Sequence, residues 1–260
     1  PLHNPNELTE RIELFGYPGT SKSYSWLTIA KWAQKTGSRA KFYCIDTDNS
    51  VKRALSRTFK ELNNVEYSSC FTWDQVTKET DKFLEKIKPN DWFIVDLICN
   101  TWSMVQSWYA QQIYKKSIDE HFLLVRQDIQ KELKDGEHAK QAQGFSGRGD
   151  WTIINKVYFA WRDKIIQQHI FNVLFCAKIK EIDKQYDNRQ TRKLFTISGG
   201  KPDGQKDIPH MMHTILMTDF DGSDWIMTTI KDRDNKYMDG QVIKDFVLNY
   251  LVPIAGWKLK

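Results

Sequence analysis

Short apolar runs and longer amphipathic segments alternate along most of this chain. Apolar runs that fit buried strands cover residues 13–15, 41–46, 65–70, 92–99 and 172–177. After the first run, Trp26, Ile29 and Ala33 recur with the spacing of one helix face. Similar periodicity continues over residues 50–59, 73–87, 101–133 and 151–169. Strands that alternate with helices predict an α/β fold with a mostly parallel central sheet and helices on both faces.

The remaining segments are polar or have a different period. Residues 134–150 and 180–192 carry charges and offer no core face, so we expect loops there. Residues 213–219 and 225–231 read as two strands around a connection that contains Gly222, which predicts a C-terminal antiparallel hairpin. A closing helix is expected over residues 241–251. We expect one domain at residues 12–260, preceded by an N-terminal extension at residues 1–11.

The composition of the chain says more about the compartment in which the protein works than about its activity. The formal net charge of +5 permits an acidic partner without requiring one. The four cysteines lack metal-ligand spacing and lie mostly in apolar runs, as expected of buried thiols in a reducing compartment. Because no apolar run approaches the roughly 18 residues of a membrane helix, we expect no membrane partner and a cytoplasmic location.

The segment at residues 14–24, LFGYPGTSKSY, joins a strand end to an amphipathic helix and has phosphate-loop order. Gly16 and Gly19 let backbone N–H groups converge on a phosphate, and the helix N-terminus favours the same anion. In the G-x-x-x-x-G-K-[ST] pattern, Lys22 reaches the terminal phosphates and the Ser23 hydroxyl binds Mg²⁺, but Ser21 replaces the second glycine. ATP and Mg²⁺ are therefore the expected cofactors. The expected nucleotide-binding residues are Gly16, Tyr17, Pro18, Gly19, Thr20, Ser21, Lys22, Ser23 and Tyr24.

Carboxylates follow two of the predicted strands. Asp96 lies in the apolar run at residues 92–99, where it could help to hold Mg²⁺, although a strand-terminal capping acid is the alternative. Asp46 and Asp48 follow another strand at the carboxyl edge of the sheet, where ligands bind in parallel sheets. Either could orient the water that attacks the terminal phosphate, and the sequence leaves the choice open.

Residues 42–49, FYCIDTDN, resemble the strand of RecA/RadA-type ATPases that ends in the catalytic glutamate, with Asp48 at the glutamate position. Residues 175–178, FCAK, resemble the strand of that family that carries a polar sensor. Residues 198–210 and 229–235 resemble segments of phage RecA-like ATPases associated with single-strand annealing. The resemblance covers about residues 12–235 and implies a RecA-like P-loop NTPase fold. It also implies a homo-oligomer, a ring or filament, in which Lys231 and Arg233 complete a neighbour's site; a charged strand end is the alternative.

Basic residues in the polar segments suit contact with nucleic-acid phosphates. Aromatic residues for base stacking are interleaved at Phe145, Trp151 and Tyr186, although solvated loops have a similar composition. Together with the resemblance, this pattern predicts an ATPase that acts on single-stranded DNA in recombination or replication. A nucleotide-controlled switch with little hydrolysis and a small-molecule kinase remain alternatives. The expected DNA-binding residues are Arg148, Lys180, Arg189, Arg192 and Lys193.

Overall fold

The computed structural model describes residues 9–134, 145, 149–185 and 187–257, and the strands within them form one sheet. Its parallel part has the order β3 (Val65–Ser69), β2 (Phe42–Asp46), β4 (Trp92–Asp96), β5 (Asn172–Glu181), β1 (Arg11–Gly16) and β7 (Thr214–Phe220). Antiparallel strands follow β7, namely β8 (Trp225–Asp232) and β9 (Val242–Lys244), while β6 (Gly200–Pro202) pairs with the end of β5. The predicted α/β class, the mostly parallel sheet and the C-terminal hairpin are confirmed.

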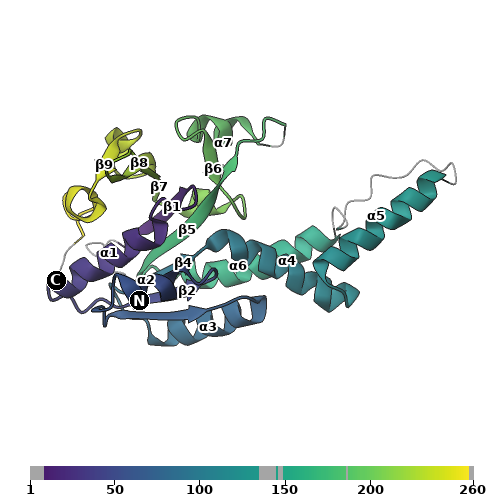
Figure 1. Ribbon diagram of the computed structural model, residues 1–260, viewed down its shortest axis with the longest axis horizontal. Coiled ribbons are helices and arrows are strands. Elements are labelled where there is room, and N and C mark those ends of the chain that lie inside the picture. The colour runs from purple at the N-terminus through teal and green to yellow at the C-terminus, as the bar shows by residue number, and fades with distance from the viewer. Residues whose placement is uncertain (1–8, 135–144, 146–148, 186, 258–260) are drawn as a thin grey trace.

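Helices cover both faces of the sheet (Figure 1). Successive side chains of a strand point to opposite faces, so each buried strand contributes to two cores. For example, Leu14 of β1 packs in one core and Phe15 in the other. The first core includes α1 (Lys22–Lys35), α2 (Ser50–Arg57) and the π-helix η2 (Val247–Leu251). The second includes α3 (Trp73–Lys86), α4 (Ile98–Tyr114) and α6 (Gly149–Ile166).

One helix departs from this layered body. In Figure 1, α5 (Ile118–Lys134) extends away from the sheet, and no side chain described in it is buried. At its base, the hydroxyls of Tyr109 and Tyr114 donate to the buried carboxylate of Asp150, at 2.7 and 2.6 Å. Phe145 packs edge-on against Tyr109 and is 1% exposed. The expectation that Phe145 stacks on a nucleic-acid base is therefore wrong, because its ring belongs to this cluster.

Three boundaries differ from the sequence-based expectations. The apolar run at residues 92–99 is not one strand, because β4 ends at Asp96 and α4 begins at Ile98. The expected loop at residues 180–192 contains the end of β5 and the start of α7 (Arg189–Leu194), where the Asn188 side chain accepts a hydrogen bond from the Thr191 amide. The expected helix at residues 241–251 is wrong, because β9 within this range pairs with β8. Only the last residues of the range form a helix, the π-helix η2.

The other described elements are short, namely α8 (Ile208–Met211) and the 3₁₀-helix η1 (Lys236–Met238). β1 begins at Arg11, the last residue of the expected extension. All four cysteines are buried free thiols, as expected. Among the described helices, none combines the length and apolar character needed to cross a membrane.

Glu13 is a carboxyl group inside the second core. It is 1% exposed, and its Oε2 has no hydrogen-bond partner among the described residues. Burial raises the pKa of Glu13 to about 8, and the nearby Lys231 opposes the shift. Because the folded state holds this proton more tightly than the unfolded state, the group's stabilising contribution is lost as the pH rises from about 4.5 to 8.

Replacement of Glu13 by glutamine should remove this pH dependence. Between pH 5 and pH 8.5, the variant should gain on the order of 3 kcal/mol of stability relative to wild type. Urea unfolding at the two pH values measures the change. Glu85→Gln, at an exposed position of α3, is the control and should leave the wild-type pH dependence intact. Parallel curves for Glu13→Gln and wild type would contradict a buried, titrating Glu13.

Candidate nucleotide-binding site

The predicted phosphate loop connects β1 to α1 at the carboxyl edge of the sheet. Gly16 has no room for a side chain, because an added Cβ would lie 2.6 Å from the Thr218 hydroxyl and closer still to the Thr218 carbonyl oxygen. The Thr20 side chain donates to the Tyr17 carbonyl at 2.8 Å and thereby closes the turn. The first turn of α1 contains no acidic residue, so the positive end of this helix faces the loop unopposed.

Ser21 occupies the position where the phosphate-loop pattern has glycine. Its backbone has φ 65° and ψ 20°, which is the left-handed region that favours glycine. At this position the loop therefore has a backbone conformation that favours glycine, although the residue is serine. A non-glycine residue in this region costs about 1 kcal/mol.

Replacement of Ser21 by glycine should consequently stabilise the protein by about 1 kcal/mol, because it relieves the backbone strain. The comparison is Ser25→Gly, one turn later in α1, which should destabilise the protein because glycine inside a helix costs about 1 kcal/mol. Urea unfolding at constant pH measures both changes. A loss of stability of the same size in both variants would contradict strain at Ser21.

Lys22 lies at the first position of α1 and is nearly buried. Its ammonium donates to the carbonyl oxygens of Gly16 and Tyr17, at 3.0 and 2.7 Å. Burial lowers the pKa of Lys22, and the neighbouring Cys176 and Asp96 oppose the shift. Two main-chain carbonyls thus hold the cation at the edge of the loop, where it lines a cavity.

Asp96 ends β4 and is completely buried. Its Oδ2 accepts a hydrogen bond from the Trp26 indole at 3.1 Å, while Oδ1 has no partner among the described residues. Burial raises the pKa of Asp96, whereas hydrogen bonds with Ser23 and Trp26 lower it. The carboxylate therefore lies beside the Ser23 hydroxyl with one oxygen still able to accept.

These oxygen atoms fit a magnesium ion that is held jointly by protein and nucleotide. Mg²⁺ prefers oxygen ligands and usually keeps waters and substrate phosphates in its shell. Ser23 and the unpartnered Oδ1 of Asp96 supply suitable oxygens. The described residues contain no group of three or more His, Cys, Asp or Glu side chains arranged to hold a metal without such help.

The structure separates the two acids that follow β2. Asp46 is buried and pairs in register with Asp96 of β4; burial and the Asp96 charge raise the pKa of Asp46 to about 7. Asp48 is exposed and lines the cavity beside the phosphate loop. Its carboxylate accepts a hydrogen bond from the Ser50 amide at 3.0 Å. Asp48 is therefore the acid with access to a ligand.

The cavity has a volume of about 680 Å³ and is markedly basic. Lys22, Arg53, Arg57 and Lys178 line it, against Asp48 as the acidic residue among those that do so. The amine of Lys178 donates to the Asn100 side chain at 3.1 Å, which fixes it at the edge of the sheet. An excess of cations next to a phosphate loop suits a polyphosphate.

Some residues that line this cavity were missed in the sequence, among them Arg53, Arg57 and Trp225. Arg53 and Arg57 are one turn apart on α2, and this spacing after Asp48 was a readable signal. Trp225, which is 51% exposed, starts β8 and lies beside the phosphate loop because β8 pairs with β7, which in turn pairs with β1. No local pattern indicates that contact.

Lys231 and Arg233 lie away from this cavity, at the other end of β8 from Trp225. The Lys231 amine donates to the carbonyl oxygens of Pro209 and Met212, at 2.9 and 2.7 Å. Arg233 donates to the His210 carbonyl at 3.1 Å. Neither residue reaches the phosphate loop of its own chain, so their role at a neighbour's site stays a prediction.

Of the expected DNA-binding residues, Arg148 lies outside the described residues. Lys180 is near the end of β5 and forms an ion pair with Asp203 at 3.8 Å. Arg189, Arg192 and Lys193 are exposed on α7. The structure thus brings four of the five together around β5 and α7. Tyr186 also lies outside the described residues. Trp151 stacks on Trp102 with 6.3 Å between the ring centroids, so its ring packs within the fold.

Comparisons with known proteins add little beyond this geometry. No protein-family model matches the chain, and no curated protein matches it. Among solved structures, the crystal structure of the RadB recombinase is similar, with a TM-score of 0.49 and 10% sequence identity over 90% of this chain and 86% of that one. At this distance, the activity has to be argued from the residues of the site itself.

Proposed function

We propose that the protein is a RecA-like ATPase of the phage type that binds ATP with Mg²⁺ and acts on single-stranded DNA in recombination or replication. The observation that carries the proposal is that Lys22, Ser23 and Asp48 line one basic cavity, with the buried Asp96 beside Ser23. All four residues were predicted from the sequence, Lys22 and Ser23 in the phosphate loop and Asp48 and Asp96 as acids near strand ends.

Each residue has a distinct task in the proposed reaction. Lys22 would exchange its carbonyl partners for oxygens of the terminal phosphates, where its charge stabilises the transition state. Asp48 would orient the attacking water, and Arg53, Arg57 and Lys178 would hold the polyphosphate. Ser23 and Asp96 would hold Mg²⁺, which when bound supplies further neutralisation of phosphate charge.

The proposed DNA-binding surface is the end of β5 together with α7. Its exposed cations, Arg189, Arg192 and Lys193, suit phosphate contacts. The same strand carries Lys178 at the nucleotide cavity and Lys180 two residues further on. In the proposed function, β5 would therefore link the nucleotide site to the DNA-binding surface.

Phosphate release from ATP and Mg²⁺ tests the proposal, with and without a single-stranded oligonucleotide at fixed salt. The proposal expects release that the single strand stimulates more than a duplex of the same sequence does. Tight ATP binding without phosphate release would instead identify a nucleotide-controlled switch. This is the main alternative function, because Ser21 replaces the glycine of the phosphate-loop pattern. Transfer of phosphate to a small acceptor would identify a kinase.

A further inference from the structure

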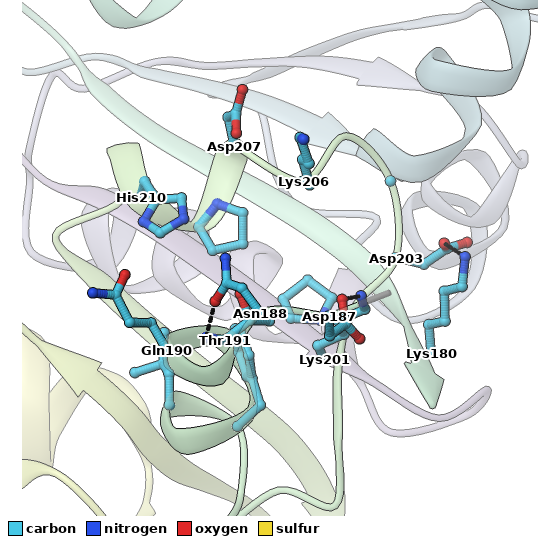
Figure 2. Close-up of a pocket in the computed structure, with 15 residues that line it drawn as sticks. Lys180, Asp187, Asn188, Gln190, Thr191, Lys201, Asp203, Lys206, Asp207 and His210 are labelled. Carbon is cyan, nitrogen blue, oxygen red and sulfur yellow. Dashed lines mark hydrogen bonds and ion pairs between the residues drawn. The ribbon is translucent and has the colours of Figure 1, made fainter. Parts of the chain in front are cut away.

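A second cavity lies beside the cations of α7. Its volume is about 530 Å³, and it is enclosed by α7, β6 and the segment that leads into α8. Figure 2 shows Asn188, Gln190 and Thr191 on one side and Lys206, Asp207 and His210 opposite them. Lys180, one of the expected DNA-binding residues, lines this cavity, and the nucleotide cavity is lined by other residues.

The charges in its wall largely cancel. Lys201 pairs with Asp187, and Lys180 pairs with Asp203 (Figure 2). Lys206 and Asp207 add one charge of each sign. A phosphate would therefore find no net positive charge inside, in contrast to the basic cavity beside the phosphate loop. The ligand that suits this space is neutral.

The uncharged part of the wall combines an apolar surface with hydrogen-bonding groups. Leu194, Phe195, Pro202 and Pro209 supply the apolar surface. Gln190 and His210 are exposed, and within the described residues their side chains have no hydrogen-bond partner. Flat apolar contacts with a few polar groups at the rim are typical of sites for small planar ligands. A nucleobase has these properties, because it offers an apolar face and a polar edge.

The position of the cavity indicates where such a base would come from. Gln190, Thr191 and Leu194 line it from α7, whereas Arg189, Arg192 and Lys193 of the same helix do not line it and are exposed. A strand whose phosphates contact these cations would pass the rim of the cavity. We propose that this cavity receives one unstacked base of the bound single strand; the inference rests on the proposed action on single-stranded DNA.

The cavity is also joined to the nucleotide site by direct contacts. β6 pairs with β5 beyond Lys178, and the Asp203 amide donates to the Lys178 carbonyl at 2.8 Å. Gly204 packs so closely on Cys99, at the start of α4, that an added Cβ would lie 3.3 Å from its Cα. A base in the cavity would thus contact the segment that supports Lys178.

The test compares two single strands of equal length and charge, one of thymidines and one of abasic deoxyribose phosphates. Fluorescence anisotropy at fixed salt gives both dissociation constants. Wild type should bind the thymidine strand at least about fivefold more tightly, since a stacked base is worth about 1–3 kcal/mol. Equal affinities would overturn the base cavity. Binding of neither strand would contradict the DNA-binding function itself.

Two pairs of substitutions separate the cavity from the cations. The double variant Gln190→Ala with His210→Ala should weaken binding of the thymidine strand alone, so that the thymidine and abasic strands bind with nearly equal affinity. Arg189→Ala with Lys193→Ala should weaken both strands equally and keep their ratio. Thr191→Phe, which fills the cavity, provides a second route to the first result, and far-UV circular dichroism confirms that each variant is folded. An unchanged ratio in folded cavity variants would overturn the proposal.

Discussion

Replacement of Lys22 by alanine is expected to reduce ATP turnover by at least about 100-fold. The loss of one preorganised donor to a developing anion typically costs about 10²–10³ in rate. The position of Lys22 makes it difficult to replace, because its ammonium is held at the loop by the Gly16 and Tyr17 carbonyls. A solvent cation would have to enter a nearly buried position to take its place.

Steady-state phosphate release and equilibrium ATP binding should be measured on the same preparations. The matched control is Lys35→Ala, which removes an exposed lysine from the last turn of the same helix and should leave turnover unchanged. Full turnover by Lys22→Ala would remove the phosphate loop from the mechanism. Lost turnover with retained ATP affinity would show that Lys22 acts mainly in the transition state.

The parts of the fold that the sequence predicted well are those with local signals. Strands buried on both faces give continuous apolar runs, as in β2 and β4. The turn at Gly16 to Ser23 combines a strand end, glycines and a lysine within a few residues, so both its place and its chemistry could be predicted. Ser21 shows the limit of residue matching, since its backbone has the glycine-like conformation although its identity departs from the pattern.

The features that were missed depend on contacts between distant segments. Residues 241–251 have no local signal for an edge strand, which exists because Val242 to Lys244 pair with β8. Trp225 reaches the nucleotide cavity only through the pairing of β1, β7 and β8. The choice between Asp46 and Asp48 likewise needed the register of β2 against β4, which places Asp46 opposite Asp96.

Replacement of Asp96 by asparagine is expected to preserve the stability of the protein while lowering its ATP turnover. The pKa of Asp96 is raised by burial, so its charge opposes folding as the pH rises above the ordinary range of a carboxyl group. An asparagine oxygen can still accept the Trp26 hydrogen bond without that charge. At pH 8, the variant should therefore be at least as stable as wild type. Its turnover should fall about 10–100-fold and its Mg²⁺ requirement should rise, because a carboxylate beside Ser23 is lost.

Asp91→Asn is the matched control, since Asp91 lies just before the other end of β4 and is also buried. Its carboxylate accepts hydrogen bonds from the Lys41 and Lys88 amides, both at 2.8 Å. An amide can present only one acceptor oxygen, so this variant should lose about 1–3 kcal/mol of stability while it keeps its turnover. Urea unfolding and magnesium titrations of phosphate release at pH 8 provide both readouts. A destabilised but fully active Asp96→Asn would show that Asp96 only caps its strand, whereas the opposite result would support its place beside the ion.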